Sequence, residues 1–336
     1  MSSLTLSFYG INIRFDSDSE KLTEEIQRDF SFFKAEAVNP HITIKIHNIV
    51  PPYQTLPSMQ ASYVSPRNVC YYHQGIKYLD YSGNGLVVYN KAASACDIYS
   101  DDYDLLHEAC YMAVLSLVNE KLDKQHIHRV HGLGLAIDNK AILLLLDMGG
   151  GKTTLAMSVL LSSQGVKLIS EDSPLIDRQG RILPFPIRIG VRPQEVPPAI
   201  PKECQRYFER EEFGPKVLID IECFKDRICE SPCRPAIVII GRRVIGRQPE
   251  IRPAFKYKAL QEFIKNCVIG LGLYQGIEYI FQKGPAEILK KIPLVISRLG
   301  NALKVIKRSK IFEFYLSADR EKNILILKQF LKNKLQ

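Results

Sequence analysis

The chain has 336 residues, 46% of them hydrophobic and 24% charged, and its formal net charge is +9. This length allows two domains of ordinary size, each with a core of its own. Because hydrophobic residues are spread along the whole chain, the composition excludes a disordered or fibrous protein. The apolar run "AILLLL" is too short to span a membrane. We therefore expect a soluble globular protein.

The cysteines bear on the cellular compartment. The first thirty residues lack the basic start and apolar run of a signal peptide. Without such a signal, eight irregularly spaced cysteines predict reduced thiols in a cytoplasmic protein. Cys223, Cys229 and Cys233 could supply ligands to a zinc ion, but the paired C-x-x-C spacing is missing. The pattern favours free thiols over a metal site.

The positive charge is concentrated late in the chain, between residues 290 and 310. Apolar residues recur there at helical intervals between lysines and arginines, which predicts a surface helix with a solvated basic face. A docking surface for an acidic peptide or a polyphosphate is the alternative. Nucleic-acid binding is disfavoured, since no recognition motif accompanies the charge.

The first 125 residues predict a β-rich α+β domain. Residues 3–15 alternate between apolar and polar side chains, as two strands joined at Gly10 do. Residues 41–49 predict a half-buried strand, and residues 68–100 predict an antiparallel meander. Helical periodicity appears at residues 19–33 and 102–124. The second helix has Asp102 or Asp104 near its start.

A second domain is expected over residues 126–336. The segment "VHGLGLAIDNKAILLLL" predicts two strands around the turn Asp138-Asn139, the second buried on both faces. A glycine-rich turn and the helical pattern "KTTLAMSVLLSSQ" follow, which is the context of a phosphate-binding loop. Glycines without a Cβ bring backbone N–H groups close to an anion, and the helix N-terminus adds its positive end. The residues expected to bind nucleotide are Gly149, Gly150, Gly151, Lys152, Thr153 and Thr154.

Two of these residues have defined roles in such loops. Lys152 would contact the β- and γ-phosphates, and the Thr153 hydroxyl would coordinate Mg²⁺. Leu146 departs from the pattern G-x-x-x-x-G-K-[ST], whose first residue is glycine. An L-residue held in a left-handed backbone costs about 1–2 kcal/mol. We therefore expect a loop that is re-shaped at Leu146 and Met148 and still binds phosphate.

An acidic pair, Glu171 and Asp172, follows the short apolar strand "VKLIS". Ligands of open α/β sheets bind at the carboxyl ends of strands. There, one carboxylate can hold Mg²⁺ while the other accepts the proton of a hydroxyl nucleophile. The position of the pair, about twenty residues after the phosphate loop, favours this function over that of two solvated acids.

In this order, the motifs over residues 126–200 resemble the bacterial HPr kinase/phosphorylase superfamily, and more closely its HPr-kinase-like relatives. Some of those relatives phosphorylate a serine of a precursor peptide in natural-product pathways. The resemblance is weak over residues 216–300 and only architectural before residue 126. It implies an α/β fold, in which a P-loop domain with a mixed central sheet and C-terminal helices follows a smaller β-rich domain. It also implies ATP and Mg²⁺ as cofactors. It does not determine the oligomeric state, although relatives are commonly homo-oligomers.

The resemblance also assigns site residues. It places His131-Gly132 near the reacting phosphoryl group, and the acidic pair, normally Asp-Asp, on Glu171 and Asp172. The first acid of the pair is then the base, and the second lies by the metal. The extra methylene of Glu171 moves its carboxylate by about 1.5 Å, so the base is where this chain departs from the family.

Other residues carry weaker expectations. Arg188, Arg192 and Lys216 are candidates to bind phosphates or the acceptor, and exposed charges beside strands are the alternative. By the same argument, the arginines of "GRRVIGRQPEIRP" are also candidates to bind phosphates or the acceptor. His126 and His128 lack a visible third metal ligand and are assigned to the surface. Residues 260–281 predict an apolar, glycine-interrupted helix.

These observations predict an ATP-dependent kinase that transfers a phosphoryl group to a serine-type hydroxyl of a peptide, a protein or a small molecule. The alternative is a module that retains the phosphate cradle but has lost catalytic geometry at Leu146, Met148 and Glu171. Such a module would use ATP as a structural or regulatory ligand. The acceptor stays unspecified, as does the donor, because the family includes pyrophosphate-dependent and reverse reactions.

Overall fold

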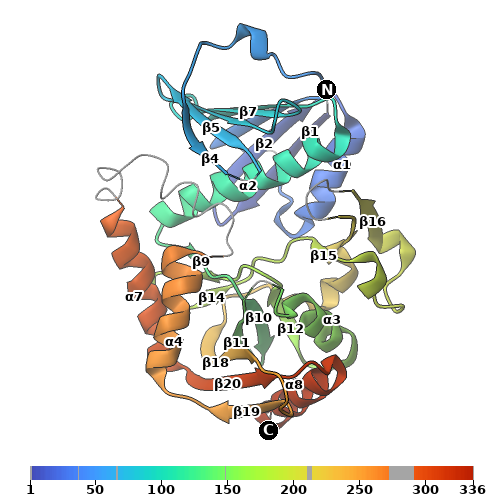
Figure 1. Cartoon of the computed structure of the whole chain (residues 1–336), viewed down its shortest axis with the longest axis vertical. Coiled ribbons are helices and arrows are strands. Elements are labelled where there is room, and N and C mark those ends of the chain that lie inside the picture. The colour runs from blue at the N-terminus through green and yellow to red at the C-terminus, as the bar shows by residue number, and fades with distance from the viewer. Residues whose placement is uncertain are drawn as a thin grey trace.

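The computed structural model of the chain describes residues 2–36, 38–65, 67–147, 149–209, 214–271 and 291–335. Met148, Lys290 and the part of the predicted apolar helix after Leu271 lie outside these ranges. Within these ranges the chain is a mixed α/β protein with four sheets. An eight-stranded sheet with two helices forms the N-terminal part, and a six-stranded sheet between helices forms the other (Figure 1).

The N-terminal sheet has the strand order β1-β2-β3-β8-β7-β6-β5-β4. Its elements are β1 (Ser2–Phe8), β2 (Ile11–Ser17), α1 (Glu20–Asp29), β3 (Ile42–His47), β4 (Ala61–Val64), β5 (Val69–His73), β6 (Ile76–Asp80), β7 (Leu86–Asn90), β8 (Ala95–Tyr99) and α2 (Tyr103–Lys124). Short 3₁₀ turns lie at Ser31–Phe33 and Tyr53–Thr55. The strand pair at the start, the strand over 42–47 and both helices are confirmed, and the Asp102 side chain caps α2 by accepting from the Leu105 N–H.

The antiparallel meander predicted over residues 68–100 is confirmed by β5 to β8, and the parallel pairing lies outside it. Strands β4 to β8 pair antiparallel with their neighbours, but β3 runs parallel to both β2 and β8. Alternation of side chains is the same in both kinds of pairing, so the sequence pattern could not reveal this arrangement. Both helices cover one face of the sheet, and α2 lies between the sheet and the second half of the chain (Figure 1).

The second half is built on a sheet of order β12-β10-β11-β18-β20-β19. The strands of this sheet are β10 (Leu133–Ile137), β11 (Lys140–Leu145), β12 (Lys167–Ser170), β18 (Arg234–Arg243), β19 (Glu250–Pro253) and β20 (Lys310–Leu316). Its helices are α3 (Lys152–Ser162), α4 (Lys256–Phe263), the π-helix Ile264–Ile269, α7 (Ile292–Arg308) and α8 (Arg320–Leu335). The central strands β11, β18 and β20 run parallel, and the others pair antiparallel.

Two smaller sheets and three short helical turns complete the fold. One sheet is β14-β13-β9, formed by β9 (His128–Arg129), β13 (Leu175–Ile176) and β14 (Ile182–Leu183). The other is β15-β17-β16, formed by β15 (Ile189–Val191), β16 (Gln205–Phe208) and β17 (Lys216–Ile219). The 3₁₀ turns are Pro193–Glu195, Lys202–Cys204 and Ile221–Arg227. We call the described residues of 188–228 the small lobe.

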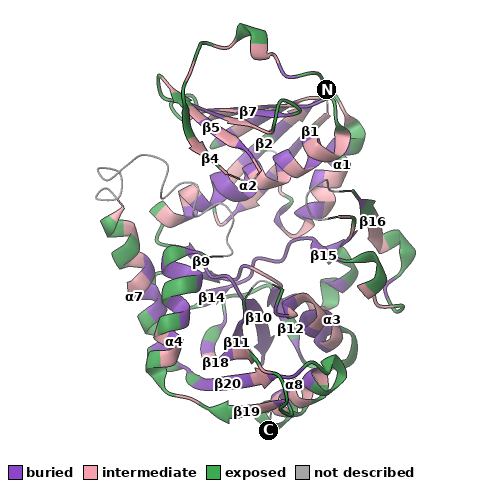
Figure 2. Ribbon diagram, viewed as in Figure 1, coloured by how far each residue is buried: buried purple, intermediate pink, exposed green. Residues whose placement is uncertain are grey.

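The apolar run of β11 is buried on both faces, as its sequence predicts. Ile142 and Leu144 pack with α3 and α8, whereas Ala141, Leu143 and Leu145 pack with α4 and α7. Strand β10 is buried along its whole length, and Figure 2 shows this central layer enclosed by helices. The turn between the two strands has positive φ at both Asp138 and Asn139, as the short hairpin requires.

The cysteines differ from the sequence-based expectation. Cys204 and Cys223 form a disulfide within the small lobe, so the prediction of eight reduced thiols is wrong. The other six cysteines form no disulfide and are buried. Among the described residues there is no cluster of three or more histidine, cysteine or acidic side chains that could hold a metal ion. In the same ranges, no helix is long and apolar enough to cross a membrane.

The basic helix α7 does not present a simple solvated face. Arg298 is buried and its Nη2 donates to Asp123 Oδ2 at 2.7 Å. Two further cations, Lys304 and Arg308, donate to backbone carbonyls of residues 178 and 179. The surface assignment of His128 is also wrong, because its imidazole is fully buried beside Asp123. Part of the positive charge in this region therefore supports the fold, although Lys304, Lys307 and Arg308 stay exposed as the surface-helix prediction expects.

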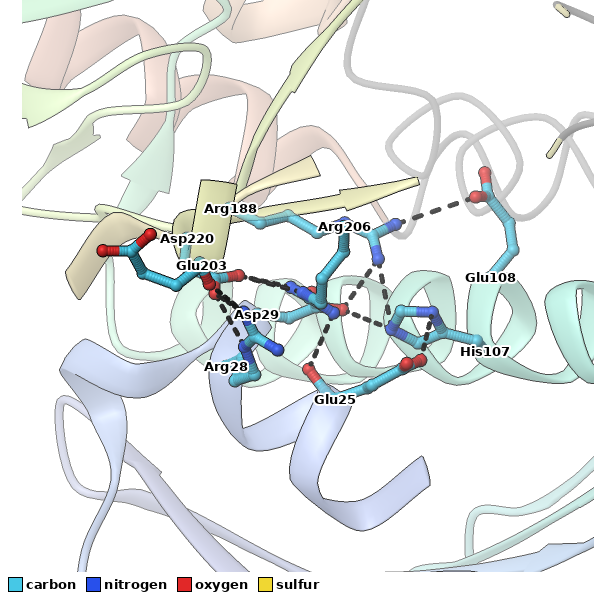
Figure 3. Close-up of polar contacts among 9 residues, drawn as sticks. All are labelled: Glu25, Arg28, Asp29, His107, Glu108, Arg188, Glu203, Arg206 and Asp220. Atoms are coloured by element: carbon cyan, nitrogen blue, oxygen red, sulfur yellow. Dashed lines mark hydrogen bonds and ion pairs between the residues drawn. The ribbon is translucent and has the colours of Figure 1, made fainter. Parts of the chain in front are cut away.

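A buried ion-pair network joins the N-terminal part to the small lobe (Figure 3). Its centre is Asp29 at the end of α1, which is 0% exposed. The Asp29 carboxylate accepts from Arg188 Nη1 at 2.7 Å, from Arg206 Nη2 at 2.6 Å and from His107 Nε2 at 2.8 Å. Arg206 also donates to Asp220 at 2.9 Å. The network therefore fixes the small lobe against α1 and α2.

Candidate active site

The predicted phosphate loop connects β11 to α3. Gly149 and Gly151 have φ values of 72° and 99°, in the left-handed region that glycine occupies without strain. Gly151 is the N-cap of α3, and its carbonyl accepts from the Leu155 N–H at 3.0 Å. The strand, loop and helix predicted from the sequence are therefore confirmed. The positive end of α3 points toward the loop that precedes it.

Leu146 does not have a left-handed backbone, so the expected strain at this position is absent. Its side chain is buried in the core. A Cβ atom on Gly150 would lie 2.2 Å from Leu146 Cδ2, and one on Gly241 would lie 1.7 Å from Leu146 Cδ1. The two glycines thus make the space that Leu146 fills. The substitution is a packing feature beneath the loop, and the prediction of a backbone cost is wrong.

Leu146→Ala is expected to reduce the free energy of unfolding by about 2–5 kcal/mol, because it leaves a cavity between Gly150 and Gly241. Urea denaturation of the two proteins measures this difference. Leu161→Ala is the matched control, because Leu161 lies on α3 with 37% of its surface exposed. A loss below about 1 kcal/mol for Leu146→Ala would contradict the packing role.

Lys152 and His131 lie in direct contact. Lys152 Nζ is 2.6 Å from His131 Nε2 and donates to the Leu146 carbonyl at 3.0 Å. The opposite ring nitrogen of His131 lies 3.0 Å from the Leu271 carbonyl, to which it can donate in the neutral Nδ1–H tautomer. Burial lowers the pKa of His131. The negative charge of Asp172 opposes this shift, and the positive charge of Lys152 adds to it. Burial also lowers the pKa of Lys152.

Gly132, which follows His131, lies so close to β11 that a side chain at this position would collide with it. A Cβ on Gly132 would lie 3.0 Å from both the Leu144 carbonyl and a methyl of Leu145. The Gly132 N–H donates to the Asp172 carbonyl at 2.9 Å, and His131 Nε2 is 3.3 Å from Asp172 Oδ1. The pair His131-Gly132 therefore holds the acidic segment beside the phosphate loop.

The acidic pair follows β12 and faces the start of α3. Thr153 Oγ1 donates to Glu171 Oε1 at 2.5 Å. Burial, together with the charge of Asp172, raises the pKa of Glu171 to about 7. The Asp172 side chain is 43% exposed and lies 3.9 Å from Lys152 Nζ. The two acids thus have different partners: Glu171 contacts Thr153, whereas Asp172 lies beside Lys152 and His131.

These groups line one cavity of about 450 Å³, within the range of small-molecule sites. All the residues predicted to bind nucleotide or metal lie on its wall, as do His131 and Glu171. Arg192 and Lys216 of the small lobe line it as well. Arg188 is also present, but its guanidinium is bound to Asp29 and stacks 3.7 Å from the Tyr111 ring centre. This geometry favours a structural role for Arg188 over a phosphate clamp.

Further wall residues come from β18 and α2. Arg243, at the carboxyl end of β18, donates to the Gly150 carbonyl at 3.0 Å. It belongs to the arginine-rich stretch noted above, and its place follows from β18 running parallel to β11. Glu108, Tyr111 and Met112 come from α2. No local signal marks them, since only tertiary packing brings α2 over the phosphate loop.

An oxygen-lined cation position is compatible with these residues. The Thr153 hydroxyl donates a hydrogen bond to Glu171, so the lone pairs of its oxygen remain available, and the exposed Asp172 carboxylate supplies a second oxygen. Mg²⁺ prefers oxygen ligands and usually takes only one or two from protein beside those of phosphates and water. Thr153 and Asp172 therefore fit the expected pair of metal ligands.

Comparisons with known proteins add little to this geometry. No family model matches the sequence, and no curated protein is similar to it. Among solved structures, the HPr(Ser) kinase/phosphatase from Coxiella burnetii is similar at 10% sequence identity with a TM-score of 0.28. The match covers 61% of this chain and 95% of that protein's chain. So low a TM-score carries no functional argument.

Proposed function

We propose that the chain is an ATP-dependent kinase that phosphorylates a serine-type hydroxyl of a peptide, a protein or a small molecule. One observation carries the proposal: a phosphate loop and an acidic pair converge on a single cavity. Glycine backbone and Lys152 supply positive charge for the phosphates, and Glu171 supplies a carboxylate whose pKa is raised to about 7. A base with a pKa near neutrality is suited to proton abstraction at physiological pH.

Each group has a defined task in this reaction. The hydroxyl oxygen of the acceptor attacks the γ-phosphorus while Glu171 accepts the hydroxyl proton. ADP leaves with the electrons of the broken P–O bond. Lys152 is already close to the loop and balances the negative charge of the phosphates. The neutral His131 ring accepts from Lys152 and orients it. Thr153 and Asp172 would hold Mg²⁺, which would neutralise part of the negative charge of the phosphates.

A regulatory or structural nucleotide-binding module is the second candidate. The observation in its favour is the contact between Thr153 and Glu171, which occupies one oxygen of the proposed base. In that case the cavity would bind ATP without consuming it. The two functions share the phosphate loop and differ only in the chemistry at Glu171.

Incubation with γ-labelled ATP and Mg²⁺, together with serine-containing peptides and hydroxyl metabolites, tests the kinase. We expect label on at least one acceptor, and loss of both transfer and ATP affinity in Lys152→Ala. Lys140→Ala is the matched control, because Lys140 is exposed at the start of β11, away from the cavity. ATP binding without transfer to any acceptor would favour the regulatory module.

A further inference from the structure

A pair of cysteines lies outside the candidate active site, in the segment that borders β12 and β14. Cys229 Sγ and Cys233 Sγ are 3.2 Å apart, whereas a disulfide bond is about 2.05 Å long. An approach of about 1.2 Å would therefore join them. The Ser231 carbonyl lies 3.2 Å from the first sulfur and 3.6 Å from the second, inside the turn that the two cysteines close. The side chains face each other across this turn.

The backbone holds both cysteines in place. The Cys229 N–H donates to the Leu168 carbonyl of β12 at 2.8 Å. Cys233 and Ile182 of β14 exchange two backbone hydrogen bonds, each 2.8 Å long. Because both ends are anchored to strands, the sulfurs remain close together in the folded chain. The pair is thus pre-organised for a bond that needs only small side-chain rotations.

The two thiols differ in their surroundings. The hydrogen bond from Cys233 lowers the pKa of Cys229 to about 7 despite its burial, and the charge of Lys167 contributes. The same hydrogen bond raises the pKa of Cys233. Cys229 is 6% exposed and Cys233 is 0% exposed. A thiolate is the reactive form of cysteine, so Cys229 is the nucleophile and Cys233 the partner that resolves its oxidation product.

We propose that Cys229 and Cys233 form a redox-active dithiol, which hydrogen peroxide converts into a second intramolecular disulfide. The Cys229 thiolate attacks one peroxide oxygen, the O–O bond breaks, and hydroxide leaves as Cys229 becomes a sulfenic acid. Cys233 then attacks the Cys229 sulfur, the S–O bond breaks, and water leaves with the proton of Cys233. Two thiols are oxidised and one peroxide is reduced to water. A small oxidant suits a sulfur that is almost enclosed.

The site adjoins the active-site strand without sharing its residues. Leu168, which holds Cys229, lies three residues before Glu171 on the same segment. Ile228 forms an isolated bridge with Leu168 as well. The new bond would close a turn already fixed between β12 and β14. The proposal concerns this modification alone and does not depend on kinase activity.

The folded, full-length protein is treated with hydrogen peroxide, quenched, and alkylated in denaturant, and its thiols are counted by mass spectrometry. Two of the six free thiols are expected to disappear, with peptide mapping showing a Cys229–Cys233 link that dithiothreitol reverses. The Cys204–Cys223 disulfide is an internal reference in the same digest. Retention of all six thiols, while a cysteine-containing peptide in the same tube is oxidised, would overturn the proposal.

Two variants separate the roles of the sulfurs. In Cys233→Ser, the sulfenic acid at Cys229 has no partner and is expected to be trapped by dimedone, which labels the wild type much less. Cys267→Ser removes another buried thiol and is expected to leave the Cys229–Cys233 link unchanged. Equal dimedone labelling of wild type and Cys233→Ser would show that Cys233 does not resolve the intermediate. The wild-type thiol count decides the matter if Cys233→Ser fails to fold.

Discussion

Glu171→Gln is expected to slow phosphoryl transfer by roughly 10²–10⁴-fold, the contribution of a positioned general base. The amide keeps the size of the side chain and can still accept a hydrogen bond from Thr153, but it cannot take the acceptor proton. ATP affinity should change little, because the phosphates are held mainly by the loop and Lys152. Single-turnover transfer from γ-labelled ATP and equilibrium ATP binding measure the two effects separately.

Two further variants serve as controls for the effect of Glu171→Gln. Glu195→Gln is the matched control, since Glu195 also lines the cavity but pairs with Arg320 at 2.7 Å and has no proposed part in the proton transfer. Glu171→Asp retracts the carboxylate by about 1.5 Å and tests whether the longer side chain suits this cavity. If Glu171→Gln transfers phosphate at the wild-type rate, Glu171 is not the base. If neither protein transfers phosphate although both bind ATP, the regulatory module is the better description.

Local sequence signals predicted the elements that carry the site. The glycine-rich turn between an apolar run and a helical pattern located the phosphate loop, and the acids after "VKLIS" follow a strand in the structure. Asp102 was predicted near the start of α2 and is its N-cap. These features depend on residues close together in the chain, where turn, cap and periodicity rules apply.

Contacts between distant segments could not be predicted in the same way. Leu146 looks like a damaged motif until Gly241, ninety-five residues later, is seen to make room for its side chain. Tyr111 and Glu108 look like ordinary helix residues, although packing of α2 places them on the cavity wall. Arg188 resembles a phosphate ligand in sequence, but the buried Asp29 binds its guanidinium. The type of a residue does not show which oppositely charged group its side chain binds in the folded protein.

The charge of Asp29 is expected to control stability in acid. Burial alone would raise its pKa, but the charges of Arg188, His107 and Arg206, with the hydrogen bond from His107, lower it to about 2 from an ordinary 3.8. A group whose pKa is lower in the folded state stabilises the protein above its unfolded pKa. That stabilisation, about 2 kcal/mol, is lost as the pH falls from roughly 4 to 2. Unfolding free energies measured across this range test the direction.

Asp29→Asn is expected to lower the free energy of unfolding at neutral pH by about 3–5 kcal/mol, because it removes the nearest anionic partner of the buried Arg188 and leaves only the longer contact with Glu108. Asn keeps the shape of the side chain, so the loss reports on charge. Asp16→Asn, which removes the acid of the exposed pair with Arg14, is the matched control and should cost less than about 1 kcal/mol. Asp29→Asn should also flatten the acid dependence of stability. Equal losses in the two variants would mean that the Asp29 network contributes no more than a surface ion pair, and that packing of α1 and α2 alone holds the small lobe beside the cavity.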